Sequence, residues 1–366
     1  MPEQRDKIYL DILRLLAIYC VVLNHTCGSF FLPAEQNGEV LYWWMLVQNQ
    51  VVKMAVPLFL MATGALLLHK EEPLSRLLKH RVLRFLGIIL FIGLLQYVLY
   101  LCRGREGRGF WDIYTLFHEK LGEYNDFWAS WFLCAYLGIL LMLPFLRMVA
   151  RAMTREAFLY MLGVQVVFCC VLPVCCLLMG EYAGHSQFSY WLPFHPQTGT
   201  LPFSAGYCAF YVLLGYFLEH RVSVEGWRKY CCPAAVLAVL CLAAGTLGME
   251  LGRFFAGESI IDQSTVFLTA FLPIPCMVAY MSLKSACVRS EFKPVTRRVI
   301  ASLGGAVLCV MLFENLFRVG CVEYCIMLQE CIGNHAAGII YAVAICIASL
   351  LVGMGLKKLP VFRRIL

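Results

Sequence analysis

The chain has 366 residues, of which 61% are hydrophobic and only 14% charged, and its mean hydropathy is +0.74. Soluble proteins carry charge on about a quarter of their residues, so this composition excludes a soluble globular protein and indicates a single integral membrane domain over residues 1–366, with no separate soluble domain. The formal net charge of +7 does not indicate a nucleic-acid partner, because the basic residues form short clusters between apolar runs instead of one exposed stripe.

Apolar segments that are long enough to cross a bilayer follow one another along the chain. They predict an all-α, polytopic integral membrane protein with about ten transmembrane helices. The sixth segment is short, and no internal repeat is visible. The expected spans are 8–32, 41–69, 82–102, 127–150, 157–180, 203–219, 231–251, 262–285, 297–319 and 337–357.

The charges between these spans predict the orientation of the chain. If the N-terminus is cytoplasmic, most of the 30 lysines and arginines fall on the inner side of the membrane. This bias is the one that the positive-inside rule describes. We therefore expect cytoplasmic N- and C-termini and a multi-pass protein of the cell membrane.

The first span contains three polar residues, Asp11, Arg14 and His25. Arg14 and His25 are eleven residues apart, so on a helix they leave the same face about 16 Å apart along the axis. Ionisable groups inside a spanning helix usually mark a pathway or a reaction centre. A histidine can act as a general base towards a hydroxyl, and a guanidinium suits phosphate. The alternatives are a satisfied core histidine, and an Arg14 that pairs with Asp11 or reaches the headgroups.

Two further ionisable residues lie inside expected spans. Lys53, in the second span, needs a partner, a cavity or a lowered pKa. Glu314, in the ninth span beside Asn315, could pair with Lys53 or Arg318, or could face an acceptor site. The residues alone leave these alternatives open.

Residues at the ends of two spans have a simple topological explanation. Arg81 and Arg84 open the third span, where arginines usually anchor a helix at the inner face, and a role in ligand binding is the alternative. Trp131 begins the fourth span at the outer interface, where an aromatic belt accounts for it.

The 19 cysteines mostly fall inside apolar runs, where cysteine behaves as a small hydrophobic residue. No cysteine pair stands beside histidines at zinc spacing, so we expect no metal site. Cys321, Cys325 and Cys331 lie near an outer loop and could include a disulfide.

Several of these motifs resemble those of the acyltransferase-3 family of polytopic membrane O-acyltransferases. The family's first motif is a basic residue that is followed, after ten residues, by a histidine. In the segment RDKIYLDILRLLAIYCVVLNHT these two residues are Arg14 and His25. KMAVPLFLMATGALLL, which begins at Lys53, resembles its second-helix pattern, and HRVLRFLG resembles the arginine-rich start of its third helix. The segments WFLCAYLGILLMLPFL and AFYVLLGYFL also resemble sequences of this family. The ninth span departs from the pattern, because it reads VMLFEN where many members carry a tyrosine and a histidine.

The resemblance implies an acyltransferase that uses acetyl-CoA or another acyl-CoA as donor, with no tightly bound cofactor. The donor's phosphates would lie near Arg14, Arg81 and Arg84, and its thioester beside His25 as the catalytic base. Lys53 or a backbone donor would stabilise the oxyanion.

The acceptor implied by the resemblance is a hydroxyl of an extracytoplasmic molecule, often a cell-envelope glycan. Glu314, Asn24 and Trp131 are the candidates for its side of the site. Acetyl is the default acyl group and succinyl the alternative, and the sequence does not specify an oligomeric state. A transporter or flippase that uses the intramembrane charges as a path is the main alternative function, and a non-catalytic sensor is a third.

Overall fold

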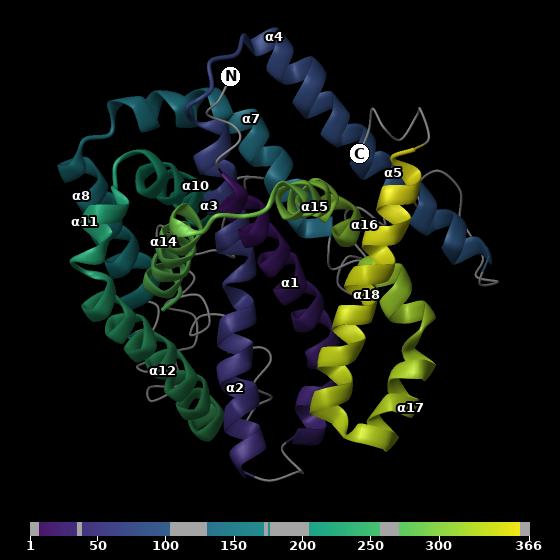
Figure 1. The fold of residues 1–366 in the computed structure, drawn as a ribbon. Coiled ribbons are helices and arrows are strands. Elements are labelled where there is room, and N and C mark those ends of the chain that lie inside the picture. The colour runs from purple at the N-terminus through teal and green to yellow at the C-terminus, as the bar shows by residue number, and fades with distance from the viewer. Residues whose placement is uncertain are drawn as a thin grey trace.

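The computed structural model describes residues 7–34, 39–102, 130–171, 175, 205–256 and 271–358. Within these ranges the chain is helical and contains no strand. Figure 1 shows the longer helices side by side in one bundle, with α1 near its centre. Helices suit apolar segments of this kind because every backbone polar group is satisfied inside the segment.

The first third of the chain forms α1 to α5, which supply part of the site described below. The second expected span is two helices, because the chain breaks at Met54, between α2 and α3. A π-helical segment, η1, joins α4 to α5. The bounds are α1 Ile8–Ala34, α2 Glu39–Lys53, α3 Ala55–Leu67, α4 Leu74–Leu77, η1 Leu78–Val82 and α5 Leu83–Cys102.

In the middle of the chain, side chains cap the N-termini of two helices, α8 and α11. Thr154 accepts a hydrogen bond from the backbone N–H of Ala157, and Ser223 accepts one from that of Gly226. The bounds are α7 Ser130–Ala152, α8 Arg155–Gln165, η3 Val166–Val171, α10 Ala205–His220, α11 Val224–Arg228 and α12 Cys231–Ala256.

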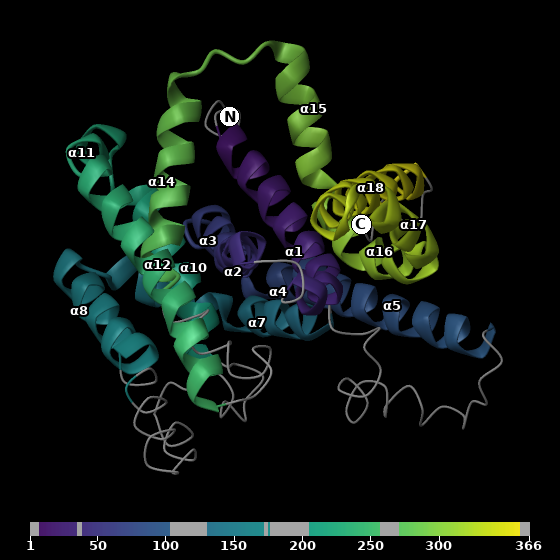
Figure 2. The ribbon, with the colours of Figure 1, turned by 90° about the horizontal axis from the view of Figure 1, so that it is seen from below.

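The last part of the chain folds back against α1. The chain bends at Ala306, so α15 and α16 run in different directions (Figure 2). Gly333, at a φ of 82°, turns the chain between α17 and α18, a conformation that favours glycine. The bounds are α14 Pro273–Arg289, α15 Pro294–Gly305, α16 Val307–Gly320, α17 Val322–Ile332 and α18 Asn334–Leu356.

Among the described residues, six segments are long and apolar enough to cross a membrane. Each of the ten expected spans contains at least part of a helix, but the count of about ten crossings and the orientation of the termini stay predictions. Helix α17, between the last two expected spans, was not expected. The six segments are Ile8–Thr26, Tyr42–Leu67, Ala135–Ala152, Cys231–Gly248, Pro294–Arg318 and Asn334–Leu356.

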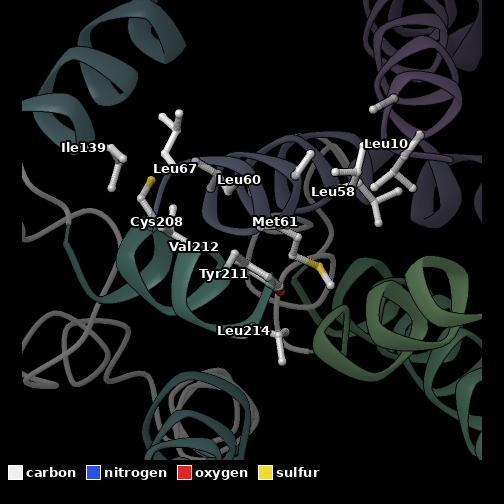
Figure 3. Close-up of a cluster of buried hydrophobic side chains, with 14 of the residues drawn as sticks. Leu10, Leu58, Leu60, Met61, Leu67, Ile139, Cys208, Tyr211, Val212 and Leu214 are labelled. Atoms are coloured by element: carbon white, nitrogen blue, oxygen red, sulfur yellow. The ribbon is translucent and has the colours of Figure 1, made fainter. Parts of the chain in front are cut away.

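Close packing of α3 against α10 forms the centre of the hydrophobic core. A Cβ atom at Gly64 would lie 1.8 Å from the carbonyl oxygen of Val212, and one at Gly215 would lie 2.0 Å from that of Met61. The two backbones therefore approach more closely than any side chain would allow. Figure 3 shows Leu60, Met61, Tyr211 and Val212 in the same cluster.

Helix α1 packs against α2, α3, α14, α15, α16 and α18, so it is enclosed on most sides. Its beginning is tied to α10 and α14 through the buried carboxylate of Glu219. Lys7 and Lys284 form ion pairs with this carboxylate at 2.9 and 3.1 Å, and the hydroxyls of Tyr9 and Tyr280 donate to it at 2.5 and 2.9 Å. These contacts fix the position of α1 and of the side chains it directs into the bundle.

The three cysteines that were candidates for a disulfide are free. Cys321, Cys325 and Cys331 lie at the N-cap, inside and near the end of α17, and none of them is bonded to another cysteine among the described residues.

Candidate active site

The side chains of His25 and Glu314 meet inside the bundle. Nδ1 of His25, on α1, lies 2.7 Å from Oε1 of Glu314, on α16. The Glu314 side chain is only 2% exposed and that of His25 is 20% exposed. A carboxylate that is withdrawn from solvent therefore supports an imidazole that is still accessible.

The roles of the two imidazole nitrogens in this contact depend on the tautomer of His25. An ionised carboxylate only accepts hydrogen bonds, so beside it Nδ1 is the donor to Glu314. In the neutral imidazole, Nε2 then has a free lone pair and can take a proton from a substrate. The pair has the geometry of a general base, His25, that is oriented by a neighbouring carboxylate, Glu314.

The structure decides between the partners that the sequence left open for Glu314. Its partner is His25, and among the described residues it makes no ion pair with Lys53 or Arg318, the two other partners that the sequence left open. The guanidinium of Arg318 instead donates to Asn315 at 2.6 Å. Lys53, the last residue of α2, has no hydrogen-bond or ion-pair partner among the described residues.

A cavity of about 630 Å³ lies at the end of the bundle where α1 begins. Its walls come from α1, α3, α4, η1, α5, α7, α15 and α16. One part is basic, with Arg14, Arg76, His80, Arg81 and Arg84. The remainder is mainly apolar and aromatic, and includes Phe59, Phe85, Ile88, Phe132, Tyr136 and Leu308. Such a cavity suits a ligand with an anionic group at one end and a less polar arm.

Arg14 lines this cavity and also pairs with Asp11 one turn earlier. The structure thus shows the pairing of Arg14 with Asp11, and the contact of Arg14 with a phosphate stays a prediction. Asp11 packs closely against Gly304 of α15, where a Cβ atom would lie 2.7 Å from its Oδ1. The carboxylate is held by this packing and directs the guanidinium of Arg14.

Arg81 lines the cavity too, and it is held by Glu72. Its Nε and Nη2 atoms donate to the two carboxylate oxygens of Glu72 at 2.9 and 3.0 Å, a bidentate arrangement. The hydrogen bonds from Arg81 lower the pKa of the Glu72 carboxyl below its ordinary value. Arg84 lies on the cavity wall one turn beyond Arg81.

Two basic residues of this wall, Arg76 and His80, were not expected from the sequence. Together with Arg84 they recur every fourth residue, which is the signal that could have identified them. The π-helical turn of η1 shifts the register between Leu78 and Val82, and both His80 and Arg81 reach the cavity. Such turns are frequent at functional sites.

The cavity ends short of the His25–Glu314 pair. Met311 is the last lining residue on α16, three residues before Glu314, which is a rise of about 4.5 Å along the helix. Neither His25 nor Lys53 lines the cavity among the described residues. Asn24 is half-buried beside His25 on α1, and the side chain of Trp131 lies outside the described part of the structure.

The sequence model of a family described as an acyltransferase domain matches residues 7–357. The chain belongs to the acyltransferase-3 family. This match confirms the resemblance drawn from the sequence motifs and covers the His25–Glu314 pair and the whole cavity. A search of curated proteins and one of solved structures gave no match.

The family and the apolar helices together describe a multi-pass membrane protein with an acyltransferase domain. In this acyltransferase-3 protein, the histidine of the family motif is supported by Glu314 in the ninth expected span. The departure of that span from the family pattern thus coincides with a direct partner of the motif histidine.

Proposed function

We propose that the protein transfers an acyl group, acetyl by default, from acyl-CoA to a hydroxyl of an extracytoplasmic acceptor. The observation that carries the proposal is the His25–Glu314 contact, which lies one helical turn beyond a cavity with a basic wall. The acceptor class that we propose is a cell-envelope glycan.

The cavity supports the donor part of this proposal. Guanidinium groups bind phosphates well, so the phosphates of coenzyme A would lie at Arg14, Arg76 and Arg84. The pantetheine arm would extend along the apolar walls towards Met311. The separation of about 16 Å between Arg14 and His25 along α1 is comparable to the length of an extended arm.

In the chemical step, the imidazole of His25 first accepts a proton and later donates it. Nε2 of His25 takes the proton of the acceptor hydroxyl as its oxygen attacks the thioester carbonyl. The carboxylate of Glu314 stabilises the imidazolium that forms. When the carbon–sulfur bond breaks, the imidazolium returns the proton to the leaving thiolate, and the acyl ester and free coenzyme A are released.

Lys53, which has no ion-pair partner among the residues that the structure describes, is our candidate for stabilising the oxyanion of this step. Lys53 lies about 21 Å along the helix axis from Leu67, the last residue of α3. His25 lies about 25 Å from Ile8 by the same count. The two residues thus have similar depths in the bundle, as a shared role requires.

The proposal includes an orientation. We place the N- and C-termini in the cytoplasm and the chain in the plasma membrane, with about ten crossings, following the positive-inside bias of the sequence. Acyl-CoA would then enter from the cytoplasm, and the acceptor would arrive from the outer side near Asn24 and Trp131. The acyl group would cross the membrane without diffusion of coenzyme A.

Transfer across a sealed membrane tests this function. The purified protein is reconstituted in liposomes that contain envelope glycan, and acetyl-CoA labelled in its acetyl group is added outside. We expect labelled ester on the enclosed glycan from the fraction of protein that is inserted with its donor cavity outward. Label that never leaves coenzyme A, in a protein that binds acetyl-CoA, contradicts the proposal.

A further inference from the structure

A second cavity, of about 460 Å³, lies between the segment that follows α3 and the last turns of α7. Its lining includes Lys70, Glu71, Glu72, Leu74, Arg147 and Arg151. Glu72 also lines the first cavity, so this carboxylate forms part of the wall between the two. The proposed acyl transfer does not use the second cavity.

Arg147 contributes an unsatisfied donor to this cavity. The residue is only 6% exposed, and its Nε donates to the backbone carbonyl of Leu67 at 3.1 Å. Its Nη2 lies 3.7 Å from Oε2 of Glu72, which is too long for a hydrogen bond. Among the described residues Nη2 has no hydrogen-bond partner. Buried donors of this kind are almost always satisfied, so the cavity lacks an acceptor at this point.

The charges of the cavity are not balanced either. Glu72 is already engaged by the bidentate contact with Arg81. Glu71 and Arg151 pair at 3.1 Å, but both are largely exposed, where such pairs contribute little. In the part of the chain that the structure describes, no carboxylate pairs with Lys70. Glu72 thus faces Arg147, at 3.7 Å, as well as Arg81, so this one carboxylate neutralises only part of the positive charge of Lys70 and Arg147.

The rim of the cavity is apolar. Leu74 is 58% exposed on one side and Met148 is 63% exposed on the other. Met148 belongs to a segment that is long and apolar enough to cross a membrane, and it lies near the end of that segment. A basic pocket of this kind beside exposed apolar side chains suits the headgroup of an anionic lipid.

We propose that this cavity binds a phosphate group, with Nη2 of Arg147 and the ammonium of Lys70 on the phosphate oxygens. The apolar rim favours the headgroup of an anionic phospholipid, whose acyl chains would lie along Leu74 and Met148. A free phosphate compound shares the same chemistry, and the experiment separates the two sources.

Native mass spectrometry of the delipidated protein tests the site with two probes, phosphatidylglycerol and phosphatidylcholine. We expect the wild type to retain one phosphatidylglycerol at least tenfold more tightly than phosphatidylcholine. The double variant Lys70→Gln with Arg151→Gln removes two positive charges from the cavity and should lose this preference about tenfold. Arg147→Gln should abolish it in a variant that keeps the wild-type melting temperature.

The matched control is Lys79→Gln with Arg155→Gln, which removes two positive charges from exposed residues outside both cavities. It should retain phosphatidylglycerol as the wild type does. A second arm adds inorganic phosphate alone and measures the melting temperature. Stabilisation by phosphate without selective lipid retention supports the same site with a free phosphate ligand. Equal retention of phosphatidylglycerol by the double variant and its control overturns the proposal, as does the absence of both effects in the wild type.

Discussion

The imidazole of His25 and the carboxylate of Glu314 lie 2.7 Å apart, although 289 residues separate them in the chain. The contact joins α1 to α16 and gives the histidine of the family motif a buried carboxyl partner. In catalytic triads, the carboxylate that contacts the histidine holds the imidazole in one tautomer and stabilises its protonated form. The first prediction follows from this contact.

Glu314→Gln should reduce kcat for acyl transfer on the order of 10²-fold or more, because the amide keeps the shape of the side chain but cannot stabilise an imidazolium. The KM for acyl-CoA should change little, since Glu314 does not line the donor cavity. Steady-state kinetics of the purified protein provide the measurement. The double variant with His25→Ala should be no slower than His25→Ala alone, because the two residues act as a unit.

The matched control for this prediction is Glu323→Gln, which neutralises an exposed carboxylate on α17. It should leave kcat within about twofold of the wild type. Equal effects of Glu314→Gln and Glu323→Gln would show that Glu314 does not support the histidine.

The basic residues of the first cavity are predicted to contact the phosphates of the donor. Arg76→Gln with Arg84→Gln should raise the KM for acetyl-CoA about tenfold, because contacts with phosphate are lost. Turnover of acetyl-pantetheine, which has no nucleotide phosphates, should hardly change. Parallel kinetics with the two donors provide the measurement, and Lys79→Gln, outside both cavities, is the control. A similar loss with both donors would contradict a phosphate contact.

The approach of α3 to α10 predicts a strong dependence of stability on Gly64. Gly64→Ala places a methyl group 1.8 Å from the carbonyl oxygen of Val212, so the helices must separate. We expect a loss of about 1–3 kcal/mol or more, measured as a lower melting temperature in detergent. Gly87→Ala is the control, because nothing lies within 4 Å of its Cβ position, and within a helix it should be neutral or slightly stabilising. Equal melting temperatures would contradict the packing described here.

The contact between Arg81 and Glu72 predicts an acid-dependent loss of stability. Its hydrogen bonds lower the pKa of Glu72 below the ordinary value of 4.5. The stabilisation is therefore fully present above pH 4.5 and is lost as the pH falls through the lowered pKa of the folded state. Glu72→Gln should remove this part of the pH dependence, while Glu225→Gln, at an exposed carboxylate, should not. Melting temperatures between pH 3 and 7 provide the comparison, and superimposable curves for wild type and Glu72→Gln would refute it.

Local spacing in the sequence predicted part of the candidate site. The pairing of Arg14 with Asp11 follows from a separation of three residues on one helix. Arg81 and Arg84 became candidates for the donor's phosphates through the resemblance to the arginine-rich start of the family's third helix, and both line the cavity. These relationships lie within one or two helical turns, where helix geometry alone determines which side chains meet.

The contacts between distant segments could not be predicted in the same way. Glu314 had several possible cationic partners in the sequence, and only the packing of α16 against α1 selects His25. The break at Met54, the bend at Ala306 and the π-helical turn of η1 also depend on neighbouring helices. The apolar segments gave the helices their approximate places, but the number of membrane crossings needs a measurement of topology.

Acyl transfer by His25→Ala, measured in the purified protein with labelled acetyl-CoA, tests the central claim most directly. We predict a loss of rate on the order of 10³-fold, with acetyl-CoA binding unchanged, since His25 does not line the donor cavity. Full transfer activity in this variant would contradict the assignment of His25 as the general base.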